Sequence, residues 1–208
     1  MMLIELIKEK LSLPLPGIDA QMRMAPPIRH RDMQAPDDVR LGGVMILLYH
    51  VDEQWNTLLI RRTEDGHTHS GQISFPGGKK DSSDPDLLYT AIRECEEEIG
   101  VRRQDIEILG SLTPVYIPPS NFLVTPVVGF IKSLQSYKAS EQEVEEIIQV
   151  PLDVLFHPEN KKEHEVFRSD RKDLGMKTPV YHLDPSIIVW GATAMMIAEL
   201  EAVLGNVE

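Results

Sequence analysis

The segment that most restricts how this chain can fold is residues 85–99, which carries an apolar stripe beside a dense row of glutamates. Placed on a helix at about 100° per residue, its apolar side chains fall on one side. They are Leu88, Ala91, Ile92, Cys95 and Ile99. Asp84 suits the N-cap position, Pro85 the first helical position and Gly100 the stop. We therefore expect a helix whose apolar side packs against the core.

Four glutamates divide between two sides of this expected helix. Glu94, Glu97 and Glu98 share an arc beside the apolar stripe, whereas Glu96 lies on the far side with Tyr89. Carboxylates at these spacings destabilise an isolated helix by roughly a few tenths of a kcal/mol per pair. A hard divalent cation between them would make the arrangement favourable. The helix alone leaves two interpretations open, a metal site and an ordinary solvated acidic face.

The rest of the chain predicts strands joined by tight turns, with helices between them. We expect a short amphipathic helix around Leu3 to Leu11, a short helix that runs into an apolar turn within 140–156, and a final helix at 185–205. We also expect a strand hairpin at 42–51 and 55–62, a short strand that ends in a turn at 71–78, and strands at 105–116 and 121–131. Residues 14–38 predict an extended, proline-rich lead-in, and residues 157–173 a solvated hairpin or loop. This order predicts an α/β layer structure around a mixed sheet. We divide it into residues 1–40, an N-terminal helix and lead-in, and one domain at 41–208.

The composition argues against several classes of function. The chain has 208 residues and a formal net charge of −12. Such an acidic protein gains nothing from counterion release by phosphates, which argues against a nucleic-acid partner. Glu5, Lys8 and Glu9 interrupt the first apolar run before a signal or membrane-spanning segment could form. The single cysteine, Cys95, allows no intrachain disulfide, so we expect a cytoplasmic protein that contacts no membrane.

Two adjacent glycines, Gly77 and Gly78, precede the acidic helix, and glycine permits close approach of the backbone to a phosphate or metal. The run GGKKDSSDPDLLYTAIRECEEEIGV resembles the Nudix box: Gly, five residues, Glu, seven residues, then Arg-Glu-aliphatic-any-Glu-Glu-any-Gly-aliphatic. Gly78 and residues 93–101 fit this pattern, with Cys95 in the aliphatic position. The pattern's first Glu is replaced by Asp84, and eight residues, in place of the pattern's seven, separate it from Arg93.

The segment LLIRRTEDGHTHSGQISFPGG is similar to the one that precedes the box in the coenzyme A pyrophosphatase branch of the Nudix hydrolases. The matching residues are Leu58, Leu59, Arg62, His69, Gly71, Phe75, Pro76, Gly77 and Gly78. Ile60, His67 and Ile73 depart from that branch, as does the tract IPPS at 117–120. The stretches NFLVTPVVGFI and WGATAMM are also similar to it, so the resemblance covers about residues 40 to 200.

The resemblance implies a Nudix-type α/β/α sandwich around a mixed sheet, with a catalytic loop–helix–loop, so that residues 41–208 form the Nudix hydrolase domain. It also implies hydrolysis of a nucleoside diphosphate linked to another moiety, with Mg²⁺ or Mn²⁺ as cofactor. The residues implied for catalysis are Arg93, Glu94, Glu97 and Glu98. The three glutamates are the implied metal ligands, with Glu94 and Glu98 ranked first because they are one helical turn apart. The residues implied for substrate binding are Arg62, His69, Gly77 and Gly78.

Several side chains have two interpretations. Glu97 and Glu143 are both candidates for the general base, and Glu143 is otherwise a solvated charge on the helix expected at 140–156. Arg62 is preferred over Arg61, because neighbouring strand residues face opposite sides and Arg62 matches the branch. Arg93 either orients a glutamate or forms an ordinary surface ion pair. We expect core positions for Cys95, Trp190, Met195 and Met196.

Three functions follow from these patterns. The favoured one is cleavage of coenzyme A to 4′-phosphopantetheine and adenosine 3′,5′-bisphosphate. A second is hydrolysis of another diphosphate such as ADP-ribose or NADH, motivated by His67 and the IPPS tract. A third is a module that binds a nucleotide and regulates a partner without hydrolysis, against which the retained glutamates argue. The expected partner is a small nucleotide-like substrate, and a homodimer is left open.

Overall fold

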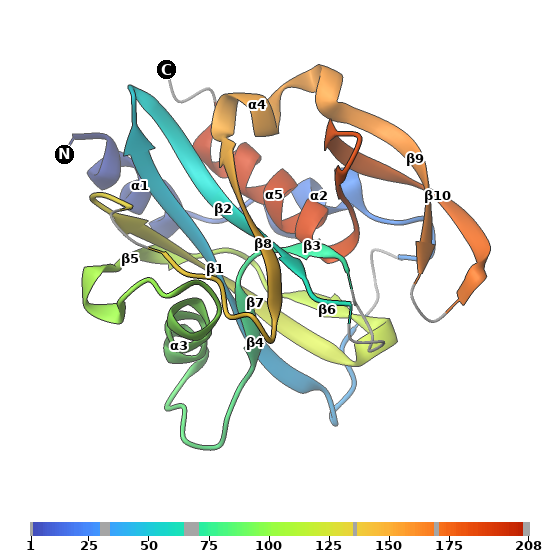
Figure 1. The fold of residues 1–208 in the computed structure, drawn as a ribbon, viewed down its shortest axis with the longest axis horizontal. Coiled ribbons are helices and arrows are strands. Elements are labelled where there is room, and N and C mark those ends of the chain that lie inside the picture. Colours follow the sequence, from blue (N-terminus) through green and yellow to red (C-terminus); the bar gives the residue numbers. More distant parts are fainter. Residues whose placement is uncertain (1, 30–33, 65–70, 135–136, 169–170, 206–208) are drawn as a thin grey trace.

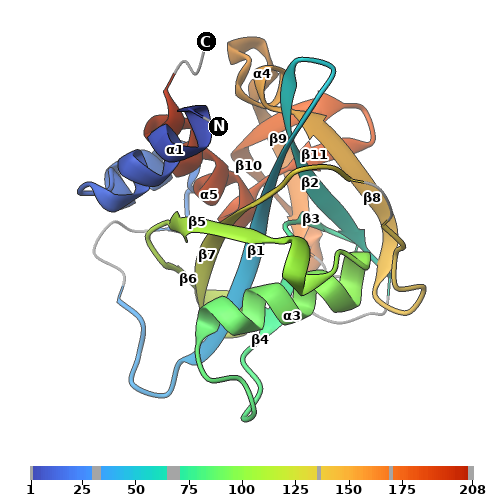
Figure 2. The same ribbon diagram turned by 90° about the vertical axis from the view of Figure 1, so that its left-hand side faces the viewer.

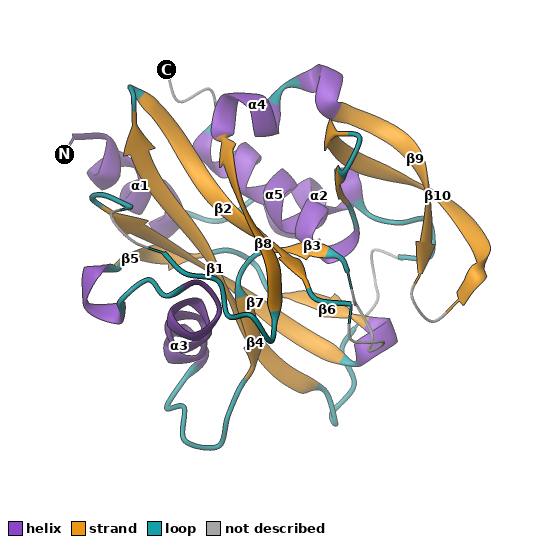
Figure 3. Cartoon of the chain, viewed as in Figure 1, coloured by secondary structure: helices purple, strands orange, loops and turns teal. Residues whose placement is uncertain are grey.

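The computed structural model describes residues 2–29, 34–64, 71–134, 137–168 and 171–205 (Figure 1). Within these residues, eight strands form the central sheet, and helices lie around it (Figure 3). The strands are β1 (Arg40–Val51), β2 (Gln54–Arg62), β3 (Ile73–Ser74), β4 (Gly77–Lys79), β5 (Glu107–Ser111), β6 (Val115–Ile117), β7 (Phe122–Ile131) and β8 (Val144–Pro151). Their order is β3–β2–β1–β7–β5, while β4 pairs with β1, β6 with β7 and β8 with β2.

The sheet is mixed, as the sequence predicts. β1 and β7 run parallel, with Val44 opposite Pro126, whereas β1 and β2 form the expected antiparallel hairpin. Side chains of β1 alternate between two core clusters, because successive strand residues point to opposite faces. Met45 and Leu47 belong to one cluster, and Ile46 and Leu48 to the other.

Helices cover both faces of this sheet, so the predicted α/β/α architecture is confirmed. Helix α3 (Leu87–Ile99) packs on the face that carries Met45 and Leu47. Helices α1 (Met2–Ser12) and α5 (Gly191–Leu204) share the other core cluster, on the opposite side of the sheet from α3 (Figure 2). The helix expected around Leu3 to Leu11 is confirmed, and its Ile7 and Leu11 are buried.

Helix α3 forms where the sequence predicts it, but its first residues differ from the prediction. Asp86, and not Asp84, is the N-cap, since its side chain accepts the backbone N–H of Tyr89 at 2.8 Å. Gly100 ends the helix with a left-handed φ of 72°, as expected. On the predicted apolar stripe, Ala91, Cys95 and Ile99 are fully buried and Ile92 is half-buried, whereas Leu88 is exposed.

The helix predicted at residues 140–156 is wrong for most of its length. Residues Val144–Pro151 form strand β8, and a short helix, α4 (Leu152–Phe156), follows. β8 pairs antiparallel with β2, with Ile148 opposite Leu59. The tract is rich in β-branched residues, which favour strands. Pairing with β2 also supplies backbone hydrogen bonds, so this tract forms a strand in place of the predicted helix.

A second sheet of three strands lies at one side of the molecule (Figure 1). β9 (Lys161–Arg168) and β10 (Arg171–Asp184) form the hairpin that the sequence predicts as one of two possibilities for residues 157–173. β11 (Ile187–Val189) then pairs with β10. The helix predicted at 185–205 therefore starts only at Gly191, because the β-branched residues before it extend the sheet.

The lead-in at residues 14–38 is only partly extended. It contains helix α2 (Gly17–Gln21) and a 3₁₀ turn, η1 (Met22–Met24), both packed on α5. The carboxylate of Glu199 on α5 accepts Gln21 Nε2 at 2.8 Å and the Gly17 N–H at 3.1 Å. None of the described helices has the length and apolar character that a membrane crossing requires.

Candidate active site

The two glycines lie in strand β4, which pairs with β1 directly beside α3. A Cβ at Gly78 would come within 2.5 Å of the Glu94 carboxyl carbon. Gly77 has a φ of 156°, and a Cβ there would overlap the backbone of β1 at Gly43 and Val44. The glycine pair therefore lets a glutamate of α3 lie directly against the backbone of β4.

Glu98 is the most buried carboxylate of the site, with its side chain 1% exposed. It accepts the backbone N–H of Gly77 at 2.7 Å and Arg62 Nη1 at 3.1 Å. Burial raises the pKa of Glu98 to about 7, although Arg62 and the Gly77 N–H act in the opposite direction. The buried charge is therefore only partly compensated by the protein itself.

Glu94 and Glu143 carry negative charge into the same region. Burial also raises the pKa of Glu94, which pairs with Arg93 Nη1 at 2.9 Å. The charge of Glu143 raises the pKa values of both Glu94 and Glu98. Glu143 lies directly before β8 in the connection from β7, and the N–H of Ser140 in this connection donates to the Glu98 carbonyl at 2.9 Å. Glu143 is thus electrostatically coupled to the site, although it does not lie on the predicted helix.

Arg93 connects the acidic groups around α3. Its Nε and Nη2 donate to the two oxygens of Asp84, at 3.0 and 2.9 Å, and its Nη1 donates to Glu97 at 2.8 Å. Asp84 is buried and also accepts Thr90 Oγ1 at 2.9 Å. The Arg93 guanidinium holds the pKa of Asp84 well below its usual range. Because this pair is bidentate and mostly buried, it is not an ordinary surface ion pair.

The two arginines at the end of β2 point in different directions. Arg62 contacts Glu98, whereas Arg61 donates to Glu146 at 3.2 Å and to the Ser186 carbonyl at 3.0 Å. The alternation of strand side chains explains this division. The structure therefore places Arg62, and not Arg61, beside the buried carboxylates.

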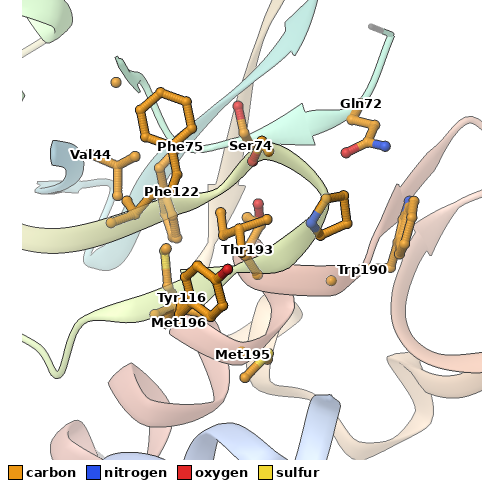
Figure 4. Close-up of a pocket in the computed structure, with 18 of the residues that line it drawn as sticks. Val44, Gln72, Ser74, Phe75, Tyr116, Phe122, Trp190, Thr193, Met195 and Met196 are labelled. Carbon is orange, nitrogen blue, oxygen red and sulfur yellow. The ribbon is translucent and has the colours of Figure 1, made fainter. Parts of the chain in front are cut away.

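A pocket of about 360 Å³ adjoins these carboxylates. Arg62, Gly77, Gly78 and Lys79 form its polar side. Its other walls are mainly apolar and come from segments far apart in the sequence (Figure 4). They include Ile28, Phe75, Tyr116, Phe122, Trp190 and Met196. A deep apolar pocket with a few convergent polar groups is the usual form of a small-molecule site.

A NUDIX domain model matches residues 39–170 of this sequence. This chain belongs to the Nudix hydrolase family. It is 35% identical over 166 residues to the uncharacterized Nudix hydrolase NudL of Enterobacter sp. strain 638. This match covers 80% of this chain and 83% of that protein. A 41% identical match to NudL of Pectobacterium atrosepticum covers 48% of this chain and about half, 51%, of that protein.

Solved structures show the same fold. A MutT/nudix family protein from Enterococcus faecalis aligns with a TM-score of 0.50 and 20% identity, over 84% of this chain and 70% of that one. RenU, a Nudix hydrolase from M. smegmatis, aligns with a TM-score of 0.50 and 14% identity, over 88% and 96%. The chain is thus a Nudix hydrolase, in a family whose members act on pyrophosphate bonds.

The predicted metal ligands of this Nudix hydrolase suit a hard cation. Nudix hydrolases generally use divalent metal ions such as Mg²⁺ or Mn²⁺. Glu94 and Glu98 offer oxygen donors only, and burial disfavours their charged forms, a cost that a bound cation would offset. Among the described residues, no three acidic, histidine or cysteine side chains form a ready-made metal cluster. One reason is that Arg93 pairs with both Glu94 and Glu97 and so holds their carboxylates. Glu97 is also 55% exposed.

Sequence patterns missed parts of the pocket and misplaced others. Trp190 is a half-buried residue of the pocket wall and not a core residue of the last helix, whereas Met195 and Met196 are buried as predicted. Pro26, Ile28 and Arg29 also form part of the wall, although the lead-in has no periodicity that would mark them. His67 and His69 lie outside the described residues.

Proposed function

We propose that this Nudix hydrolase cleaves the diphosphate bond of coenzyme A or a derivative of it. The products would be 4′-phosphopantetheine and adenosine 3′,5′-bisphosphate. The single observation that carries the hydrolytic part is the position of two desolvated carboxylates, Glu94 and Glu98, against β4 at the edge of the pocket. The coenzyme A part rests on the resemblance of residues 58–78 to the coenzyme A pyrophosphatase branch.

In this proposal, Glu94, Glu97 and Glu98 hold Mg²⁺ or Mn²⁺. A bound cation would neutralise phosphate oxygens and help to activate the attacking water. Glu97 would contribute by turning from Arg93, which now holds it at 2.8 Å. Arg93 itself stays anchored on Asp84, so that it positions the glutamates and does not bind substrate.

The polar side of the pocket suits a diphosphate. Arg62 and Lys79 bring positive charge to the wall that Gly77 and Gly78 form. Both glycines line the pocket, so a bound diphosphate would lie close to the backbone of β4 beside the carboxylates of α3. We assign Arg62, Gly77 and Gly78 to the binding of the phosphates, and His69 keeps this predicted role from the resemblance.

Glu143 is our candidate for the general base. Its charge acts on both Glu94 and Glu98, so it lies near the site from a different element than α3. Glu97 remains the alternative, although its pairing with Arg93 favours a ligand or structural role. Glu143→Gln should then lower kcat more than it weakens Mn²⁺ binding, while Glu97→Gln should affect both.

The test is incubation of the protein with coenzyme A and Mg²⁺ or Mn²⁺, followed by identification of the products by mass spectrometry. Appearance of the two expected halves supports the proposal. No turnover of coenzyme A with either metal, while another diphosphate is cleaved, would overturn the choice of substrate.

A second candidate substrate is another nucleoside diphosphate derivative, such as ADP-ribose or NADH. The tract at 117–120, which departs from the coenzyme A branch, forms part of the pocket wall through Pro118, Pro119 and Ser120. A panel with coenzyme A, ADP-ribose and NADH at equal concentration separates the two candidates by kcat/KM.

A further inference from the structure

Part of the pocket wall comes from segments outside the family match. Residues 26–29 precede the matched range 39–170, and residues 190–196 follow it. The part of the substrate that these segments contact is therefore not specified by the Nudix box. This inference rests on the proposed function, namely that the pocket receives a diphosphate substrate beside Glu94 and Glu98.

Four aromatic side chains among the described residues line this pocket, and three of them have other roles. Phe75 is 1% exposed and belongs to the core. The guanidinium of Arg40 covers the Phe122 ring at 4.1 Å, and the Tyr116 hydroxyl pairs with Asn121 Oδ1 at 3.2 Å. Trp190 remains as the fourth. Among the described residues it neither packs on a core cluster nor makes a ring or side-chain hydrogen-bond contact.

The backbone holds Trp190 in place without burying its ring. Val189, before it, is fully buried and pairs with Tyr181 in the sheet. Gly191, after it, has a φ of 65°, which turns the chain into α5. Figure 4 shows the indole on the opposite side of the pocket from Phe122 and Tyr116, with Thr193 between them. A large flat side chain fixed at a pocket wall loses little entropy on contact with a ligand.

A second observation concerns the polar edge of the same pocket. Ser74 lines it, and its Oγ is buried without a hydrogen-bond partner among the described residues. Buried hydroxyls normally have a partner, so this one suits a ligand that brings a donor or acceptor. A planar heterocycle offers both an apolar face for the indole and a polar edge for the hydroxyl.

We propose that Trp190 is a substrate-binding residue that stacks on a planar aromatic ring of the substrate, its nucleobase. The nucleotide half of the diphosphate then occupies the pocket, and the other half extends toward solvent. Every nucleobase has a flat face that can stack on an aromatic side chain. Exchanging one base for another should therefore change the binding affinity less than removing the indole ring does.

Tryptophan fluorescence tests this directly, because the chain has two tryptophans. Trp55 lies away from the pocket walls and packs against His50 and Phe130, so Trp55→Phe leaves Trp190 as the single reporter. The Trp55→Phe protein is titrated without metal with AMP, ribose 5-phosphate and 4′-phosphopantetheine. We expect saturable quenching by AMP and none by ribose 5-phosphate, which lacks the base. Equal responses to both, a response to 4′-phosphopantetheine alone, or no response to any of the three would overturn the proposal.

Kinetics on the best substrate of the panel give a second readout. Trp190→Ala should raise KM by about 5- to 100-fold, the range that loss of one stacked base gives, and lower kcat less. Trp190→Phe should keep most of the affinity, because a phenyl ring can also stack on a base. A purely structural role of the indole gives no reason to expect this recovery. An equal loss in both variants, or a loss confined to kcat, would contradict stacking. AMP quenching in a protein that does not cleave coenzyme A would count against the proposed substrate only.

Discussion

The carboxylate of Glu98 connects three elements. It belongs to α3 and accepts hydrogen bonds from Arg62 on β2 and from the Gly77 N–H on β4. Its neighbours compensate the buried charge only in part, so burial keeps its pKa high. In the proposed metal site, a bound cation would compensate the remainder of this charge. The acidic side of α3 is therefore not an ordinary solvated face at this residue, whereas Glu96, paired with Arg103, is a surface group.

Glu98→Gln tests the role of this residue. We expect activity to fall roughly 100-fold or more, because metal stabilisation of transition-state charge contributes several kcal/mol. The Kd for Mn²⁺, measured by calorimetry, should rise as well, while the circular dichroism spectrum stays that of the wild type. Glu96→Gln is the matched control on the same helix. Full activity of Glu98→Gln would exclude the metal site.

Gly78 and Gly77 make a second pair of predictions at the same scale. The Cβ of Gly78→Ala would meet the flexible end of Glu94, so activity should fall strongly while the melting temperature changes little. The Cβ of Gly77→Ala would meet the backbone of β1, which cannot move as easily, so this variant should be destabilised. Thermal unfolding and kinetics on both proteins check this, and the reverse pattern would contradict the clashes expected at the two glycines.

At the scale of elements, α3 depends on two aspartates with different roles. Asp86 caps the helix, and Asp84 anchors Arg93 from the turn before it. The sequence pattern predicts Asp84 as the N-cap, whereas the structure gives this role to Asp86. The difference arises because Asp84 is buried against Thr90 and Arg93, an arrangement that depends on the path of the turn.

Asp84→Asn should destabilise the protein by about 3 kcal/mol at pH 7, because it leaves the charge of Arg93 without its main partner. Asp86→Ala should cost about 1 kcal/mol, the usual cost of a lost cap. The folded-state pKa of Asp84 is lowered, so its stabilisation is present above the unfolded pKa of about 3.9 and is lost as pH falls below it. The difference between wild type and Asp84→Asn in urea unfolding should therefore shrink below about pH 4. A difference that grows with acid would contradict the assignment.

At the scale of the whole molecule, the lead-in and the last helix act as one unit. Glu199 is fully buried on α5 and accepts hydrogen bonds from Gln21, Gly17 and the Thr113 N–H. This network fixes the segment that leads to Ile28 and Arg29, which line the pocket. The N-terminal segment thus contributes to the pocket, while the predicted division at residues 40 and 41 stays a prediction.

Glu199→Ala should therefore loosen the lead-in. Removing a buried acceptor leaves three donors unsatisfied and should cost about 3 kcal/mol or more. Limited proteolysis should then cut faster within residues 17–29, and KM should rise. Glu201→Ala is the control on the same helix. Glu201 forms a partly exposed ion pair with Lys161, and such a pair contributes about 1 kcal/mol or less to stability. Equal proteolysis of the two variants would contradict the network's role.

The sequence by itself determined the features that local physics encodes. The apolar stripe of α3, the glycine turn and the hairpin of β1 and β2 follow from periodicity, caps and turn residues, and the box follows from its resemblance to the Nudix pattern. From these came the family, the fold class and the candidate residues, including the preference for Arg62 that its position beside Glu98 supports.

Only the tertiary structure decided the contacts between distant segments. It turned residues Val144–Pro151 into a strand because β2 offered a ladder, and it made Asp84 the anchor of Arg93 because the turn buries it. It brought residues 26–29 and Trp190 to the pocket, far in sequence from the box. Such contacts depend on which surfaces meet in the folded chain, and no local period or spacing records that.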